Sequence, residues 1–289
     1  MDTSGLSEWL GRRLTKPARR VVSLVPSLTE AVFRLGAGDR LVARTDFCVR
    51  PRGEVESVRS VGGTKNPDVP TIVGLRPDLV LANREENTKI RVQELARHVA
   101  VLLTDPRSPR DVPALWVELG RALGEETRSE HLAVACRGEI GRLVSAELSN
   151  CPAFVYWIWR NPWMAAGHGT YISELLELAG WRNALPSECT RYPKVAPEEA
   201  LACTPDALLF SSEPFEFELP QDFEDFARPV TEIDGLWRLG DGPLAVPVEG
   251  EPLSWYPSLT VEGLRYAESL RIAIVDRWSS QSGTSGFDR

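Results

Sequence analysis

Aromatic side chains gather in loops of the second half of the chain, where they could form flat apolar walls for a ligand. Trp157 and Trp159 lie two residues apart in an apolar run, and further rings follow in later segments: Trp163, Phe215, Trp255 and Tyr256. Aromatic rings are costly to leave in water, and they suit a large planar ligand. Some of them also fit a protein core. We expect at least two of Trp159, Trp163 and Trp255 to face a ligand.

The loop Gly62–Asn66 (GGTKN) is rich in backbone and side-chain donors. Its spacing differs from the GxxxxGK[ST] pattern of a P-loop, so nucleotide binding is a poor interpretation. The loop is either a tight turn or a segment whose backbone amides contact a ligand.

The sequence contains no pattern typical of catalysis or of a metal site. A GxSxG elbow is absent, and the adjacent pair Glu85 and Glu86 is more typical of a solvated surface than of acid–base catalysis. His168 precedes a predicted helix and is the only histidine placed to meet a ligand, either as an axial metal ligand or as a bystander. Without HxxxH or a Cys/His cluster, we predict no catalytic residue and no protein-only metal site.

Short apolar runs alternate with helical segments, which predicts an α/β fold with parallel sheets. The predicted strands are 20–25, 40–44, 78–82, 101–103, 153–159, 207–210 and 244–246. Ligands of such sheets bind beyond the carboxyl ends of the strands. This rule brings together the loops Pro26–Glu30, Asp46–Cys48, Gly62–Asn66 and Asn83–Asn87 from the first half, and Trp159–Thr170, Ser211–Phe215 and Ser254–Ser258 from the second.

The stretch Glu125–Ser149 has apolar residues at helical spacing and predicts one long helix of about 35 Å. The segments on either side share a weak repeat, because VGLRPDLVLAN (73–83) matches LACTPDALLFSS (201–212). We therefore predict two Rossmann-like α/β lobes bridged by this helix, with a ligand cleft between them. The predicted divisions are a polar lead-in (1–19, with a short helix near Leu6–Leu14), lobes at 20–124 and 150–278, the helix at 125–149, and a disordered tail at 279–289.

Composition restricts the partners and the compartment. The net charge of the 289 residues is −8 without a basic run, which excludes nucleic acid and anionic membranes as probable targets, and no apolar run could span a bilayer. Residues 1–20 do not resemble a secretory signal, and the five cysteines are scattered. These features favour reduced thiols in the cytoplasm, although a mature exported protein would look much the same.

Three segments carry a resemblance to a known family: VVSLVPSLTEAVFRLG (21–36), VGGTKNPDVPTIVGLRPDLVLAN (61–83) and WRNPWMAAGHGTYISELLELAGWRN (159–183). Together they resemble the helical-backbone metal-receptor family, the vitamin B12- and siderophore-binding proteins of ABC importers, and especially its cobalamin-binding branch. The resemblance covers residues 20–270 and implies two α/β lobes joined by one long helix, as in class III periplasmic binding proteins.

The resemblance also implies which residues contact a ligand. Positions matching the ligand-facing loops of the cobalamin binders are Phe47, Gly63, Thr64, Asn83, Glu85, Trp163, Trp255 and Tyr256, with Pro26 and Ser27 lining the same cleft. The ligand implied is cobalamin, another corrinoid or a related metal chelate, held by stacking and by polar contacts with its amides, and no cofactor is required.

Two features depart from the family pattern. Importer-coupled members are exported or lipid-anchored, whereas this sequence shows no signal. Those members also dock to an ABC permease through a glutamate on each lobe. Glu198 or Glu199 matches this place in the second lobe, but Pro70 occupies it in the first.

We therefore expect a monomeric, non-catalytic small-molecule binding protein, either a cytoplasmic carrier or an importer subunit. The alternatives are a cytoplasmic enzyme that uses Glu85, Glu86 and His168, and a protein-interaction module with an exposed aromatic surface.

Overall fold

The computed structural model describes residues 6–146, 150–226, 228–233 and 236–281. The chain divides into two units: the first ends at Gly138 and includes Trp255–Thr260, and the second comprises the remaining residues from Glu139 onward. The boundary falls inside α5 (Glu126–Val144). Both units are α/β structures, as the alternation of strands and helices in the sequence predicts.

The sheet of unit 1 has the strand order β1-β5-β4-β2-β3. Its parallel strands are β2 (Val21–Ser23), β3 (Leu41–Arg44), β4 (Leu79–Asn83) and β5 (Ala100–Thr104). Its helical segments are α1 (Pro26–Arg34), η1 (Gly38–Arg40), η2 (Val55–Ser57), α2 (Val69–Gly74), α3 (Lys89–Ala96), η3 (Pro109–Asp111) and α4 (Val112–Leu123). All five residues of β4 and of β5 are buried, which explains why these strands read as continuous apolar runs.

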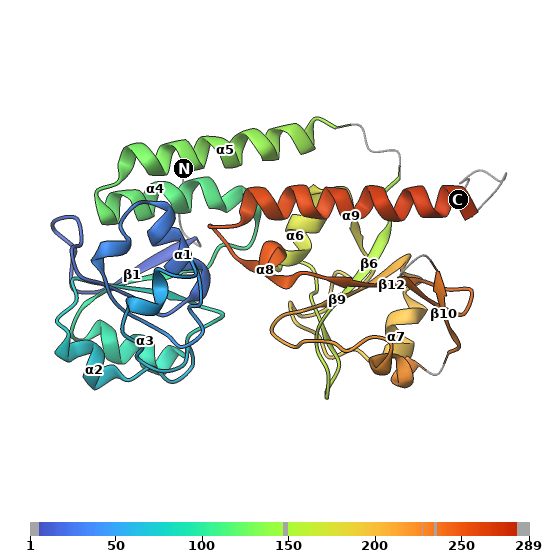
Figure 1. Ribbon diagram of the computed structural model, residues 1–289, viewed down its shortest axis with the longest axis horizontal. Helices are drawn as coiled ribbons and strands as arrows, with labels where there is room; N and C mark the ends of the chain where they lie inside the picture. The colour runs from blue at the N-terminus through green and yellow to red at the C-terminus, as the bar shows by residue number, and fades with distance from the viewer. Residues whose placement is uncertain (1–5, 147–149, 227, 234–235, 282–289) are drawn as a thin grey trace. The chain divides into compact units, whose positions relative to one another are not determined.

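The helices of unit 1 cover both faces of its sheet. Val69 and Ile72 of α2 and Val92 and Leu95 of α3 join a core with alternate strand residues, so these two helices share one face. The helices α1 and α4 lie on the opposite side of the sheet (Figure 1). The carboxyl ends of the strands are instead met by the loops that follow them and by the segment Trp255–Thr260.

Residues 7–11 correct the expectation of a short helix in the lead-in. They form β1 (Ser7–Gly11), which pairs antiparallel with β5 and makes the sheet mixed. The strand is partly exposed and its sequence SEWLG is mostly polar. Its conformation comes from pairing with β5, about 95 residues away, and local sequence does not encode this pairing.

The sheet of unit 2 has the order β10-β11-β12-β9-β6-β7, with β8 beside β6. The strands are β6 (Ala153–Trp159), β7 (Met164–Ala165), β8 (Arg182–Asn183), β9 (Ala207–Ser211), β10 (Val230–Ile233), β11 (Leu236–Leu239) and β12 (Leu244–Val248). The helices are α6 (Tyr171–Leu178), α7 (Pro197–Ala202), η4 (Gln221–Phe226), α8 (Gly250–Ser254) and α9 (Thr260–Gln281). The core strands β6, β9 and β12 are parallel, whereas β7, β10 and β11 pair antiparallel at the edges.

The sequence repeat has a structural counterpart in each unit. Asp78 Oδ2 accepts a hydrogen bond from Arg20 N at 3.0 Å, and Asp206 Oδ2 accepts one from Ala153 N at 2.7 Å. Asp78, which precedes β4, thus holds the start of the neighbouring strand β2, and Asp206, which precedes β9, holds the start of β6. Two residues earlier, Arg76 and Thr204 both have positive φ, 49° and 50°. Each Pro-Asp therefore marks the same left-handed turn into a buried strand.

The helix α5 is held separately in each unit. In unit 1 it passes so close to α4 that a Cβ on Gly120 would lie 2.0 Å from Ser129 Oγ. In unit 2, the buried Glu139 accepts hydrogen bonds from Arg142 and, at 2.9 Å, from Arg265 of α9. The helix α9 continues to Gln281, so residues 279–281 of the predicted disordered tail are helical. Residues 282–289 of that tail lie outside the described part of the chain.

Substitution of Gly120 by alanine tests the close approach of α4 and α5. The added methyl group would overlap the Ser129 hydroxyl, so we expect a loss of about 1–3 kcal/mol in the free energy of unfolding. Gly138→Ala is the matched control, because nothing lies within 4 Å of its Cβ position, and it should stabilise α5 by about 0.5–1 kcal/mol. Urea titration of both variants measures the difference. Equal stability of the two would contradict the close contact.

The buried Glu139 generates a pH-dependent prediction. Burial raises the pKa of this carboxyl, but hydrogen bonds from Arg142 and Arg265 outweigh burial and leave the pKa below its ordinary value. A lowered pKa contributes stability that is present above the ordinary carboxyl pKa and is lost as pH falls through the lowered pKa. We expect Glu139→Gln to cost about 1–2 kcal/mol at pH 7, since both arginines are largely exposed, and to cost less in acid. Urea unfolding at several pH values measures this, and a cost independent of pH would oppose it.

Candidate functional site

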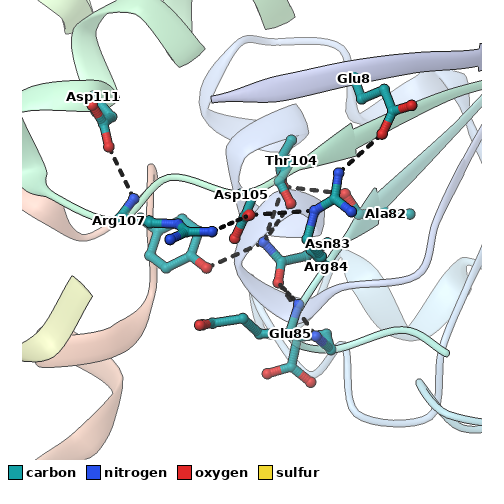
Figure 2. Close-up of polar contacts among 11 residues, drawn as sticks. Glu8, Ala82, Asn83, Arg84, Glu85, Thr104, Asp105, Arg107 and Asp111 are labelled. Carbon is teal, nitrogen blue, oxygen red and sulfur yellow. Dashed lines mark hydrogen bonds and ion pairs between the residues drawn. The ribbon is translucent and has the colours of Figure 1, made fainter. Parts of the chain in front are cut away.

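The amide of Asn83 joins three segments at the carboxyl ends of the strands of unit 1 (Figure 2). Asn83 is the last residue of β4 and is 1 % exposed. Its Nδ2 lies 3.1 Å from Thr104 O, from Thr104 Oγ1 and from the hydroxyl of Tyr256. Its Oδ1 accepts from Glu85 N at 2.8 Å and from Glu86 N at 3.3 Å. One buried side chain thus positions the end of β5, the turn after β4 and the segment Trp255–Thr260.

A second buried amide, that of Asn87, connects the neighbouring loops. Its Nδ2 donates to Thr64 O at 2.9 Å and to Leu24 O at 3.2 Å, and its Oδ1 accepts from Asn83 N at 2.9 Å. Asn87 is 6 % exposed, so each of these groups would otherwise be buried without a partner. The loops after β2 and β4 and the GGTKN turn are therefore held in one arrangement. The rule that ligands bind beyond strand ends groups these loops, but nothing in the sequence identifies Asn87 as their common contact.

Charged side chains surround this polar core. Arg84 Nη2 donates to Glu8 Oε2 of β1 at 2.9 Å, and Arg84 Nε lies 3.3 Å from Asp105 Oδ2 (Figure 2). Arg107 donates to the same Asp105 oxygen at 3.2 Å. Both arginines are about half exposed, and such ion pairs contribute little stability. They fasten the edge strand β1 to the strand ends rather than forming a reactive group.

The other residues predicted for unit 1 differ in how much surface they offer. Phe47 is 61 % exposed, and a Cβ on Gly63 would lie 3.6 Å from its ring, so these two are neighbours. Ser27 and Thr64 are buried, whereas Pro26 and Glu85 are half-buried. Phe47 is therefore the large apolar surface that unit 1 presents at this edge.

Trp255 and Tyr256 belong to unit 1, although they come late in the chain. They are 8 % and 7 % exposed, and the guanidinium carbon of Arg50 lies 5.8 Å from the centre of the Trp255 ring. Tyr256 holds Asn83 through its hydroxyl. The late segment thus completes the strand-end cluster of the first half.

Trp163 of unit 2 lies in the core. It is 8 % exposed, stacks on Phe217 with ring centres 5.6 Å apart, and donates from Nε1 to Asp225 Oδ2 at 2.9 Å. That hydrogen bond and the neighbouring Arg160 hold the pKa of Asp225 below its ordinary value. Trp163 therefore supports the neighbouring loops and presents little surface to a ligand.

Trp159 is the exposed aromatic residue at the carboxyl end of β6. It is 40 % exposed, and its ring centre lies 5.5 Å from that of Phe215, which follows the adjacent parallel strand β9. Phe215 contacts Phe217 at 4.8 Å, and Phe217 in turn stacks on Trp163. We call these four rings (Trp159, Phe215, Phe217 and Trp163) the aromatic column. It connects an exposed indole to the core of unit 2.

His168 is engaged by its own unit. Its Nε2 lies 2.9 Å from Leu185 O, and its Nδ1 lies 3.3 Å from Glu177 Oε1. Ligation of a metal through either nitrogen would require one of these contacts to break. In the described ranges no group of three or more His, Cys, Asp or Glu residues could hold a metal ion.

The predicted docking residues lie on short helices. Glu198 and Glu199 are both exposed on α7, and Glu199 Oε2 accepts from Ala196 N at 2.8 Å as part of the helix cap. Pro70 is exposed in the first turn of α2. Within the part of the chain that the structure describes, none of the helices is long and apolar enough to cross a membrane.

The chain matches known binding proteins along most of its length. The family described as "Periplasmic binding protein" matches residues 21–227. The vitamin B12-binding protein of Pectobacterium carotovorum subsp. carotovorum (strain PC1) is 27 % identical over 231 residues, which cover 78 % of this chain and 83 % of that protein. That of Vibrio parahaemolyticus serotype O3:K6 is 24 % identical over 200 residues, or 68 % and 72 % of the two chains.

Solved structures show the same fold. The periplasmic heme-binding protein RhuT of Roseiflexus sp. RS-1 aligns with a TM-score of 0.70 and 22 % identity, over 90 % of this chain and 98 % of that one. The periplasmic vitamin B12-binding protein BtuF of Vibrio cholerae aligns with a TM-score of 0.71 and 18 % identity, over 89 % and 98 %. The two-lobed α/β fold predicted from the sequence is confirmed.

These matches also correct the predicted compartment. The leading residues and the scattered cysteines favour the cytoplasm, but the matched family and the solved neighbours are periplasmic, so the cytoplasmic expectation is wrong. None of the five cysteines, all of which lie in the described ranges, forms a disulfide, so cysteine pairing gives no guide to the compartment here. The resemblance read from the three sequence segments is confirmed, and the chain belongs to the periplasmic binding protein family.

Proposed function

We propose that this protein binds a metal-chelating macrocycle, cobalamin or another corrinoid in the first place, without catalysing a reaction and without a cofactor of its own. It would do so as a monomeric substrate-binding subunit of an ABC importer. The observation that carries the proposal is the aromatic column, which keeps Trp159 exposed and fixed at a strand end. An exposed indole is costly in water, and a flat apolar ligand removes that cost.

The column also supplies preorganisation. Trp159 contacts Phe215, and the rings below it are anchored in the core by Trp163. A side chain that is already ordered loses little conformational entropy when a ligand binds to it. On unit 1, Phe47 provides a second exposed ring beside the GGTKN turn. Both surfaces suit a ligand with extended apolar faces.

The names of the relatives support the choice of ligand. The curated relatives are vitamin B12-binding proteins, whereas the solved neighbours include both vitamin B12- and heme-binding proteins. Corrinoids and haem share a large metal-bearing ring, so the aromatic residues suit either. On unit 1 we propose ligand contacts from the residues with accessible surface, Pro26, Phe47, Gly63 and Glu85, and positioning of these by the buried residues Ser27, Thr64, Asn83, Trp255 and Tyr256. On unit 2 we propose Trp159 as the contact, with Trp163 supporting it from the core.

For the permease partner, Glu198 is the stronger docking candidate on α7. The carboxylate of Glu199 is already used by the helix cap, whereas no hydrogen bond or ion pair of Glu198 is found among the described residues. Because Pro70 offers no charge on α2, we propose that α7 provides the main electrostatic contact with an arginine of the permease.

Truncation of the aromatic column tests the ligand-binding proposal. Trp159→Ala and Phe215→Ala remove the exposed ring and its support, so each should weaken binding of cyanocobalamin or haemin about tenfold, or about 1.4 kcal/mol. Trp9→Ala is the matched control, because Trp9 is 42 % exposed but lies on β1. Calorimetric titration of purified protein gives the affinities. The proposal fails if the wild-type protein binds neither compound.

Asn87→Ala tests the positioning of the unit 1 loops. The change removes the partners of Leu24 O, Thr64 O and Asn83 N, and we expect a loss of about 2–4 kcal/mol in stability because each buried orphan is costly. It should also weaken ligand binding, measured at a temperature where the variant remains folded. Glu86→Gln, an exposed change one residue away, should alter neither quantity. Wild-type stability of Asn87→Ala would contradict the role given to this amide.

A further inference from the structure

The exposed ring of Trp159 stands at the base of a turn that projects beyond the sheet of unit 2. The pairing of β6 with β9 ends at Trp157, and beyond it Trp159 pairs with Met164 of β7. Residues 160–163 form the turn between these two strands. A strand pair this short is marginally stable by itself. The position of Trp159 therefore depends on what holds the turn.

One carboxylate oxygen of η4 holds both ends of this turn. Asp225 Oδ2 accepts a hydrogen bond from Arg160 Nε at 3.0 Å and another from Trp163 Nε1 at 2.9 Å. The guanidinium carbon of Arg160 also lies 5.7 Å from the centre of the Trp163 ring, which adds a cation–π attraction. The first and last residues of the turn are thus joined to each other and to a single acceptor outside it.

A second carboxylate of η4 joins the turn to the other side of the aromatic column. Asp222 Oδ1 forms an ion pair with Arg160, and Asp222 Oδ2 accepts from Glu218 N at 2.7 Å. Glu218 lies three residues after Phe215 in the same segment. Asp222 therefore connects the two segments whose rings, Trp159 and Phe215, have their centres 5.5 Å apart.

These ion pairs differ from ordinary surface pairs. The side chain of Asp222 is 7 % exposed and that of Arg160 is 21 % exposed, so both charges are largely removed from water. Loss of one partner would leave the other charge buried and unpaired, which is costly. The guanidinium group also engages the two carboxylates through separate nitrogens, which fixes its direction as well as its distance.

We propose that Arg160, Asp222 and Asp225, here called the polar clamp, are positioning residues that order the Trp159 ring before a ligand binds. This inference rests on the proposed function and adds to it the residues that hold the aromatic surface in place. A ring that moved freely would lose conformational entropy on binding, and the polar clamp removes that loss in advance. The polar clamp acts through Trp159 and its neighbour Phe215.

A double-mutant cycle tests whether the polar clamp acts through Trp159. The ligand is cyanocobalamin or haemin, whichever the wild-type protein binds more tightly. We expect Arg160→Gln to weaken its binding about three- to fivefold, which is less than the loss expected on removal of the ring itself. In a Trp159→Ala background the same change should alter the affinity by less than about 1.5-fold, because the ring that Arg160 positions is gone. A general structural defect would instead lower the affinity by the same factor in both backgrounds.

Two carboxylates of η4 give a matched pair of variants. Asp225→Asn keeps the size of the side chain but removes the charge that faces Arg160, so it should weaken binding about two- to threefold and lose this effect in the Trp159→Ala background. Glu224 is exposed on the same 3₁₀ helix, and Glu224→Gln should leave the affinity unchanged. Arg160→Lys keeps the charge without the planar fork, so its affinity should lie between those of the wild-type protein and Arg160→Gln.

Fluorine NMR gives a readout that needs no ligand. In protein labelled with 5-fluorotryptophan, the signal of Trp159 is the one that disappears in Trp159→Phe. In Arg160→Gln we expect this signal to move towards the position of free 5-fluorotryptophan, because the ring is no longer held against Phe215. Glu224→Gln should leave the signal where it is.

The outcomes distinguish the positioning role from the proposed function. If the wild-type protein binds a ligand but Arg160→Gln binds it equally well, or loses the same factor in the Trp159→Ala background, the positioning role is overturned and the binding function stands. An unchanged Trp159 signal in Arg160→Gln would also overturn the positioning role. Binding of neither cyanocobalamin nor haemin would overturn the proposed function, whereas a shifted signal would still show that the polar clamp orders Trp159.

Discussion

The buried amide of Asn83 is the constraint on which the first unit depends. Parallel strands end in backbone groups that have no further ladder partner, and at this edge Asn83 and Asn87 supply the missing partners for Thr104, Leu24, Thr64 and the turn at Glu85. The same amide contacts the hydroxyl of Tyr256, a residue 173 positions later. Hydrogen-bond satisfaction, rather than apolar packing, therefore determines how these loops are arranged at the strand ends.

Much of the fold was predictable because its central strands are continuous apolar runs. The expected strand 153–159 coincides with β6, and the match between residues 73–83 and 201–212 reflects equivalent left-handed turns at Arg76 and Thr204. The edge strands were missed for a physical reason. The strand β1 and the pair β10 and β11 are partly exposed and gain their conformation from distant partners, so no local pattern marks them.

The site was predictable only in part, because residue type does not reveal burial. Trp157, Trp159 and Trp163 have the same side chain, yet the first and third are core residues and only Trp159 is well exposed. Asn87 carried no signal beyond its place after a strand. It acquires its role from atoms far away in sequence, such as Thr64 O and Leu24 O.

In the proposed function, the two units would contribute different chemistry to recognition. The aromatic column of unit 2 offers an apolar surface that is ordered before binding, which provides affinity for any flat ring and little choice among rings. Unit 1 adds buried polar groups, and one of these atoms, Glu30 Oε2, has no hydrogen-bond partner among the described residues. Affinity from apolar area and selectivity from unsatisfied polar atoms are separable quantities. In the proposed function, substitution of a few polar residues of unit 1 would therefore change which ligand is preferred, while the aromatic column would still provide its apolar surface.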